Sequence, residues 1–402
     1  MMEIFLVLCL CLTAQSSNIW QVHEATDPLN EAQLYHPAIV CDAGSTGSRV
    51  FAFYVLKDNQ NDDLGNVTVE LMGRSGVGLS EFARSGMFDE ATDSITPFIT
   101  KGINRLGKSV PIYVFATGGV RQLPEELRER LWKHLASSLS ASFHDHLGKI
   151  ELQILDGDDE ALFGLISANY LVHDIRPTEI HTPLPDPVGV LDLGGSSLEV
   201  AIAGDDKIVG SHDDVLVSFT GLGLRKMWDK LSANNSSSLC LFETGNGVAC
   251  REAIRGIIME DSDFISKIGL ADLDRVSKFV GISAFAYSMD FAHWVMSMKT
   301  PTALSTFSLE YPSPSVSSMR DACDVICSYP LLDALFRQHQ FTTAREVPER
   351  CFNICYVSEV LSTLLESRIN ERIVHFLLQV SPYCYFYLFR LLRPAEVRSN
   401  GR

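Results

Sequence analysis

The sequence has little positive charge, and nowhere does that charge gather in a run. Its 402 residues contain 33 Lys and Arg against 50 Asp and Glu, which gives a formal net charge of −17. Proteins that bind nucleic acids or anionic membranes electrostatically present a basic patch, so the composition argues against both partners. A polyanionic substrate would have to be bound by local hydrogen-bond donors and a cation.

Long hydrophobic runs, short-period repeats and low-complexity tracts are also missing. The apolar stretch at residues 4–12 is too short to span a bilayer, and Ala14-Gln15-Ser16 follows it as a small-residue cleavage pattern. We therefore predict a signal peptide over residues 1–17, with an apolar amino-terminal strand as the alternative. With 46% hydrophobic residues, the chain can form the cores of two or three domains.

Eight of the ten cysteines lie beyond the predicted signal peptide. Cys41 lies in an apolar run and is expected to be a buried thiol. Cys240 and Cys250 flank a loop rich in Gly, Ser and Asn and suit a local disulfide. Four of the remaining five form two Cys-x3-Cys pairs, which are Cys323, Cys327, Cys351 and Cys355, and the fifth is Cys384 near the carboxy terminus. Zinc binding is the alternative for these pairs, but the spacing is loose and no His cluster is near, so we predict disulfides of undetermined connectivity.

Glycosylation sequons agree with export. They begin at Asn66, Asn234 and Asn235, and the last two overlap. Together with the cysteines and the predicted signal peptide, they place the protein in the lumen of the secretory pathway (endoplasmic reticulum or Golgi) or outside the cell.

Two short loops share one design. Residues 42–49 and 192–197 each begin with Asp directly after an apolar run, turn through Gly, Ser or Thr, and lead into a second apolar run. This pattern predicts two β-hairpins with small polar tips. Glycines let backbone N–H groups approach an anion, hydroxyls add donors, and Asp42 and Asp192 could bind a hydrated divalent cation. The pair therefore suggests a duplicated phosphate-binding loop.

Between and after these loops the chain alternates in α/β fashion. We expect strands at residues 111–116 and 150–155, and helices from Pro124 and over residues 161–171. The proline-rich stretch at residues 176–187 is predicted to be an inter-domain linker.

Five segments, in order, resemble the apyrase family, the nucleoside triphosphate diphosphohydrolases. They are Asp42–Arg49, Ala116–Pro124, Gly157–Leu171, Leu191–Ile202 and Phe279–Tyr287. The resemblance implies an α/β, actin-like two-lobe fold. Each lobe would be ribonuclease-H-like, with a mixed sheet flanked by helices and the nucleotide in the inter-lobe cleft. The lobes are expected at residues 36–176 and 187–370, followed by a divergent carboxy-terminal tail at residues 371–402.

The resemblance also implies an enzyme that hydrolyses nucleoside diphosphates or triphosphates, and a role for each of several residues. Gly47-Ser48-Arg49 and the stretch from Gly78 to Ala83 look most like the luminal nucleoside-diphosphatase branch, which cleaves UDP or GDP to the monophosphate and phosphate. Mg2+ or Ca2+ is the expected cofactor, with Asp42 and Asp192 at the metal, Glu160 as general base, Ser197 orienting water and Tyr287 stacking on the base. The expected phosphate-binding residues are Ser45, Thr46, Gly47, Ser48, Arg49, Thr117, Gly194, Gly195 and Ser196.

Simpler structural roles remain open for some of these residues. The acidic residues before Ala161 could only stabilise a helix amino terminus. Tyr287 could be a core residue, and Arg49 a surface charge. Ala161 and Leu165 replace a family glycine and tryptophan, changes expected to affect packing.

Glu199 stands where the family usually has glutamine, and we expect it near the attacking water and the metal. Exopolyphosphatases have glutamate at the matching place, so an exopolyphosphatase-like phosphohydrolase is one alternative function. A catalytically impaired nucleotide-binding glycoprotein is another.

The tail does not match the family. A membrane anchor there is disfavoured, because His375, Gln379 and Pro382 interrupt the roughly 20 apolar residues that a span requires.

Overall fold

The computed structural model describes residues 34–57, 64–173, 183–204, 213–297, 309–328, 339, 342, 346–366 and 371–378. Contacts divide the chain into two compact units, with the boundary between Ile154 and Leu155. The predicted signal peptide, most of the predicted linker and the tail beyond residue 378 lie outside the described residues.

The first unit contains one five-stranded mixed sheet with the order β3-β2-β1-β4-β5. Its strands are β1 (Leu34–Gly44), β2 (Gly47–Lys57), β3 (Leu64–Ser75), β4 (Ile112–Ala116) and β5 (Ile150–Ile154). Its helices are α2 (Leu79–Arg84), α3 (Phe88–Asp93), α4 (Thr96–Leu106), α5 (Gly118–Arg121) and α6 (Glu125–Ser142). On α6, Leu131, Leu135 and Leu139 recur every fourth residue, so they form one buried stripe in the core of this unit.

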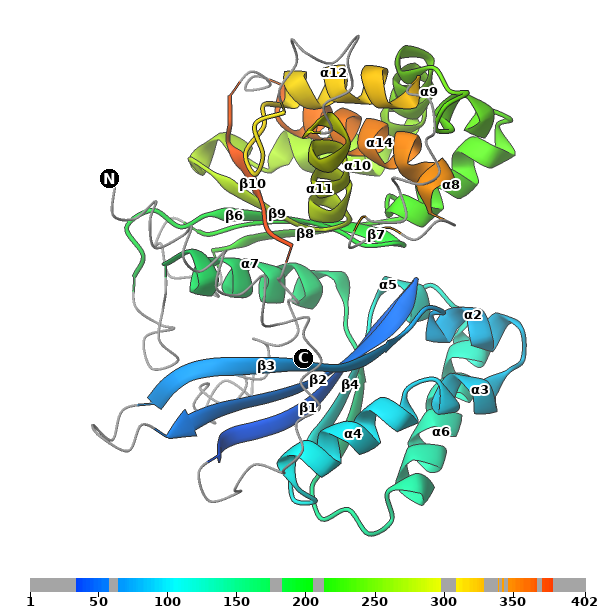
Figure 1. Ribbon diagram of the computed structural model, residues 1–402, viewed down its shortest axis with the longest axis vertical. Coiled ribbons are helices and arrows are strands. Elements are labelled where there is room, and N and C mark those ends of the chain that lie inside the picture. The colour runs from blue at the N-terminus through cyan, green and yellow to red at the C-terminus, as the bar shows by residue number, and fades with distance from the viewer. Residues whose placement is uncertain are drawn as a thin grey trace. The chain divides into compact units, whose positions relative to one another are not determined.

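The second unit contains a second five-stranded sheet, with the order β10-β9-β6-β7-β8 (Figure 1). Its strands are β6 (Gly189–Leu193), β7 (Ser197–Ile202), β8 (Val215–Thr220), β9 (Phe279–Ser283) and β10 (Val374–Phe376). Its longer helices are α7 (Gly157–His173), α8 (Leu224–Ala233), α9 (Gly247–Glu260), α10 (Ser262–Leu270), α11 (Ala284–Ser297), α12 (Val316–Cys327) and α14 (Arg350–Leu364). Short 3-10 helices cover Ser237–Cys240, Leu273–Arg275 and Val347–Glu349.

The two sheets have the same topology. In each, the first three strands pair antiparallel in chain order, and the fourth and fifth strands run parallel to the first. This repeated order and direction of strands confirms the predicted pair of ribonuclease-H-like lobes. It also places the two expected phosphate loops at equivalent positions, each joining the first and second strands of its sheet.

Helix α7 belongs with the second unit, whereas the predicted first lobe extends through it to residue 176. Ala161, Leu165 and Ala168 on α7 pack against Val190 and Val280 on one face of the second sheet. Figure 1 shows α7 on the opposite face of this sheet from α11, α12 and α14. The helix follows the last strand of the first sheet in the chain. Its apolar side is nevertheless buried against the second sheet, and it therefore belongs to the second unit.

The start of the divergent tail supplies a strand of the second sheet. Val374, His375 and Phe376 form β10, which pairs in parallel with β9. Gly281 on β9 leaves room for Phe376, because a Cβ there would lie 2.8 Å from Cδ1 of its ring. Residues 374–376 therefore complete the repeated five-stranded topology. Within the described part of the chain, no helix has the length and apolar character needed to cross a bilayer.

Candidate active site

The β6–β7 hairpin of the second unit carries the predicted Asp192 loop. The loop follows buried β6 and turns through residues 194–196, where the N–H of Gly194 donates to the carbonyl of Ser197. Across the hairpin, Asp192 pairs in register with Glu199. Both carboxylates are buried, with 5% and 1% of the residue exposed. The hairpin thus positions two acidic side chains beside a turn made of small residues.

Glu160 is buried at the start of α7, in the same unit. The carboxylate of Asp156 accepts a hydrogen bond from the N–H of Asp159 at 2.7 Å, so Asp156 stabilises the helix amino terminus. Glu160 lies one position further on, and only 5% of it is exposed. The helix-capping role of the structural alternative is therefore filled by Asp156. The role of the buried Glu160 stays a prediction.

Three carboxylates interact electrostatically in this unit. Burial raises the pKa of Glu199 well above its ordinary value, and the negative charges of Glu160 and then Asp192 raise it further. Hydrogen bonds from Ser197 and Ser218 act in the opposite direction on this pKa. The hydroxyl of Ser218 donates to Oε1 of Glu199 at 3.0 Å. The structure thus brings the predicted base and the predicted metal-side residues of the second unit into one cluster.

The β1–β2 hairpin of the first unit holds Asp42 in the equivalent place. Asp42 is buried and pairs in register with Arg49, and Nη1 of Arg49 lies 3.6 Å from its Oδ2. Thr46 is exposed at the tip, whereas Ser48 is 1% exposed. Among the described residues, the Ser48 hydroxyl has no hydrogen-bond partner. The tip therefore offers Ser45 and Thr46 to a ligand more readily than Ser48.

Thr117 lies beside this first hairpin because β4 runs parallel to β1. Thr117 follows the last residue of β4, and its N–H donates to the carbonyl of Ala43 at 3.4 Å. The next turn packs tightly on the loop, since a Cβ on Gly119 would lie 2.7 Å from the Cα of Ser45. The first unit thus gathers its predicted site residues at the carboxyl ends of β1 and β4.

Tyr287 lies in the first turn of α11, directly after β9. Strand β9 runs parallel to β6, with Leu193 opposite Ser283, so Tyr287 follows the sheet edge that carries the Asp192 loop. Its side chain is half-buried. This position suits either a contact with a nucleobase or a packing role.

Three further residues beside these loops have no role assigned from the sequence. Ser218 is placed by its register opposite Glu199 on β8. Gly78 and Gly223 each pack against the phosphate loop of their own unit. The signal for the glycines is a repeat, Gly76-Val77-Gly78-Leu79 and Gly221-Leu222-Gly223-Leu224, each placed after the third strand of its sheet.

The donor set of the second unit suits a hard divalent cation. Asp192 and Glu199 offer carboxylate oxygens, the ligands preferred by Mg2+ and Ca2+, and the first unit by itself offers that of Asp42. The buried negative charge around Glu199 also favours a cation, because it otherwise raises the pKa of that carboxyl group. These residues therefore fit the predicted metal.

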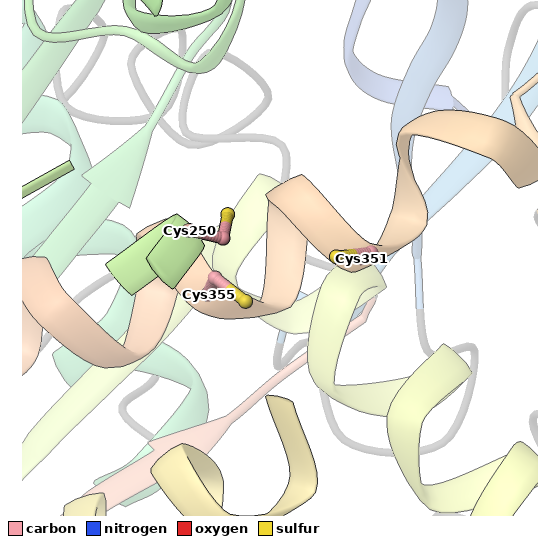
Figure 2. A group of neighbouring side chains, drawn as sticks. All are labelled: Cys250, Cys351 and Cys355. Atoms are coloured by element: carbon pink, nitrogen blue, oxygen red, sulfur yellow. The ribbon is translucent and has the colours of Figure 1, made fainter. Parts of the chain in front are cut away.

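The cysteine cluster of the second unit is a set of disulfides. Cys240 bonds Cys250, and α12 is joined to α14 by Cys323–Cys355 and Cys327–Cys351. Figure 2 shows the side chains of Cys250, Cys351 and Cys355 as one group. Their sulfur atoms lie within 4.8 Å of one another. Because all six thiols are oxidised, these sulfurs are not thiolate ligands, and the disulfide prediction is confirmed. Cys41 is a buried free thiol, also as predicted.

Curated proteins with similar sequences are nucleotide phosphatases by name. The chain is 25% identical over 240 residues to nucleoside-diphosphatase mig-23 of Caenorhabditis briggsae, which covers 56% of this chain and 42% of that protein. It is 31% identical over 172 residues to probable apyrase 2 of Oryza sativa subsp. japonica, covering 41% and 35%. The chain thus spans less than half the length of these relatives.

Solved structures share the fold. An exopolyphosphatase from Cytophaga hutchinsonii matches with a TM-score of 0.53 and 16% identity, covering 88% of this chain and 97% of that one. A nucleoside triphosphate hydrolase from Neospora caninum matches with a TM-score of 0.53 and 13% identity, covering 95% and 96%. These similarities confirm the actin-like two-lobe fold. The sequence profile of the GDA1/CD39 (nucleoside phosphatase) family matches residues 28–217. The resemblance to apyrases is therefore confirmed over residues 28–217, the part of the chain that is similar to the GDA1/CD39 family.

Proposed function

We propose that this protein hydrolyses the terminal phosphoanhydride bond of nucleoside diphosphates, with UDP or GDP as substrate, in the lumen of the secretory pathway. The family domain and the name of the nematode relative support nucleotide phosphoanhydride hydrolysis. The predicted secretory leader and the disulfides support the compartment.

The observation that carries the proposal is the buried carboxylate of Glu160 beside the Asp192 loop. In the proposed reaction, a water oxygen attacks the terminal phosphorus while the bond to the bridging oxygen breaks. Glu160 accepts a proton from that water, and Ser197 orients the water. A carboxylate held within reach of the attacking water is a usual general base for such a step.

The loops would bind the phosphates. Backbone N–H groups at residues 195–197, in the turn that begins at Gly194, and at residues 44–48 would supply donors, as would the hydroxyls of Ser45, Thr46 and Ser196, with Thr117 and Arg49 beside the first loop. Arg49 lies against Asp42, so an incoming phosphate would compete with Asp42 for the guanidinium. Tyr287 is proposed to stack on the base.

Asp42 and Asp192 are proposed to hold Mg2+ or Ca2+ through its water shell, with Glu199 next to it. When bound, the cation would neutralise charge on the transferred phosphoryl group. Asp192 and Glu199 would keep that shell in place from the two strands of one hairpin.

An exopolyphosphatase-like activity is the second candidate, because Glu199 adds a carboxylate where apyrases usually have glutamine. The compartment argues against it. A catalytically impaired nucleotide-binding protein is the third, suggested by the divergent tail.

Phosphate release from UDP, GDP, ADP, UTP, ATP and polyphosphate, with and without EDTA, separates the three. We expect release from UDP or GDP that stops in excess EDTA and is lost in Asp42→Ala and Asp192→Ala. Release from polyphosphate alone would favour the second candidate, and nucleotide binding without release the third. Full activity in EDTA would exclude the proposed role of the cation.

A further inference from the structure

The turn of the second-unit loop is held from behind by its carbonyl groups. Three consecutive carbonyls accept hydrogen bonds from backbone N–H groups of the segment that begins at Gly221. The Gly194 carbonyl accepts from the N–H of Leu224 at 2.9 Å, and the Ser196 carbonyl accepts from the N–H of Gly221 at 2.9 Å. The Gly195 carbonyl accepts two bonds, from the N–H of Arg225 at 2.9 Å and from the N–H of Lys226 at 3.2 Å. The first three N–H groups of α8 thus donate hydrogen bonds to carbonyls of the loop.

This arrangement fixes the direction of the loop amides. In a trans peptide the carbonyl of one residue and the N–H of the next point to opposite sides of the chain. Since the carbonyls of Gly194, Gly195 and Ser196 face the α8 segment, the N–H groups of Gly195, Ser196 and Ser197 face away from it. Successive N–H groups on one side of a turn make an anion-binding concavity.

Gly223 allows this close approach. It is the N-cap residue of α8, with φ −68° and ψ 159°. A Cβ on it would lie 2.3 Å from the nitrogen of Ser196 and 2.4 Å from the carbonyl carbon of Gly195. Any larger residue would force the helix and the loop apart.

The first unit repeats part of this arrangement. Gly78, the N-cap residue of α2, has φ −73° and ψ 148°, and a Cβ on it would lie 2.3 Å from the carbonyl oxygen of Ser45. The repeated Gly-x-Gly-Leu sequence therefore marks the place where a helix start meets a phosphate loop in both units.

We infer that the amino terminus of α8 is a positioning element for the second phosphate loop, and that Gly223 and the Leu224 N–H are its positioning groups. The helix does not bind the anion itself. It orients the amides of residues 195–197 toward the phosphate. The inference deepens the proposed function, because it assigns the α8 segment a task in that same phosphate site.

A comparison of the variants Leu224→Pro and Leu224→Ala tests the inference. Proline is well accepted at the first position of a helix, and the backbone of Gly223 suits a residue before proline. Proline removes the Leu224 N–H and puts a ring carbon where its hydrogen pointed, so the Gly194 carbonyl must move. Alanine removes the side chain and keeps the N–H.

We expect Leu224→Pro to lower kcat about 100-fold and to weaken the binding of inorganic phosphate, measured by calorimetry, while Leu224→Ala stays within about 3-fold of wild type in both. Their thermal unfolding midpoints should be similar. Equal effects of the two variants on kcat and phosphate binding would overturn the inference.

A second pair covers the case in which Leu224→Pro does not fold. Gly223→Ala should weaken phosphate binding, whereas Gly256→Ala on α9, where a Cβ would meet nothing within 4 Å, should not. Unchanged phosphate binding in Gly223→Ala would also overturn the inference. Calorimetry with phosphate needs no turnover, so a wild-type protein that hydrolyses no nucleotide would refute the proposed function without deciding this one.

Discussion

The two hairpins carry opposite charges at one equivalent residue position. Opposite its leading aspartate, the first hairpin has Arg49 and the second has Glu199. The Asp42 carboxylate is therefore partly neutralised by a guanidinium at 3.6 Å, while Asp192 lies in a cluster of negative charge. The lobes repeat a topology, but their charges suit different tasks, with the second lobe better suited to a base and a cation.

Glu199→Gln should raise the stability of the metal-free protein at neutral pH. The folded-state pKa of Glu199 is raised, so the native state holds a proton that the unfolded state releases above the ordinary value of 4.5. Stability must then fall as the pH rises from this value toward the folded pKa, by at most about 1.4 kcal/mol per pH unit. Glutamine does not titrate, so the variant does not lose this stability as the pH rises.

Thermal unfolding in EDTA between pH 5 and 8 measures this difference. The wild-type midpoint should fall relative to that of Glu199→Gln as the pH rises, and added Mg2+ should reduce the gap. Parallel curves for the two proteins would mean that the carboxylate carries no such penalty.

At the scale of elements, β10 makes the beginning of the tail part of the second core. Phe376 is buried against Gly281, and the N–H of Leu377 donates to the carbonyl of Gly281 at 3.0 Å. We expect Phe376→Ala to cost about 3–5 kcal/mol in the free energy of unfolding. The control, Leu270→Ala, truncates a side chain on a residue that is 86% exposed and should change it by less than about 0.5 kcal/mol. Denaturant unfolding that gives the two variants equal stability would show that β10 contributes nothing.

The disulfides between α12 and α14 give a second prediction at this scale. Each closes a loop, with separations of 32 and 24 residues, and should contribute about 2–4 kcal/mol. A reductant should therefore lower the thermal unfolding midpoint by several degrees, whereas a chelator of zinc should leave it unchanged. Peptide mapping without reduction should recover the same three cysteine pairs. A chelator effect equal to that of the reductant would restore the zinc alternative.

Much of the architecture could be predicted from the sequence because it rests on local patterns. The Asp-led glycine turns specify both hairpins, and the apolar runs beside them specify the buried strands. The unit to which α7 belongs could not be predicted, since helix burial depends on packing against a sheet formed by distant residues. The same holds for β10, whose three residues become a strand only beside Gly281, and for Ser218, placed by sheet register.

At the scale of the whole molecule, the proposed luminal location predicts glycosylation. Asn234 and Asn235 are exposed at the end of α8, where a glycan can be accommodated, while the side chain of Asn66 lies outside the described residues. Endoglycosidase treatment of protein expressed in eukaryotic cells should increase its gel mobility. Replacing both asparagines by Gln should remove part of that shift, and unchanged mobility of the wild type would argue against passage through the secretory pathway.

Glu160 is proposed as the general base, and its amide variant shows whether the reaction depends on that carboxylate. The measurement is kcat for UDP and GDP hydrolysis in Glu160→Gln and in Asp158→Asn, an exposed neighbour in the same helix turn, with nucleotide binding checked by calorimetry. An amide keeps the shape of the carboxylate but cannot take the proton, so Glu160→Gln should lose roughly 10²–10⁴-fold in kcat and still bind nucleotide. Asp158→Asn should remain close to wild type. Wild-type kcat in Glu160→Gln would contradict the account, and its loss in Glu199→Gln instead would assign the base to the other carboxylate.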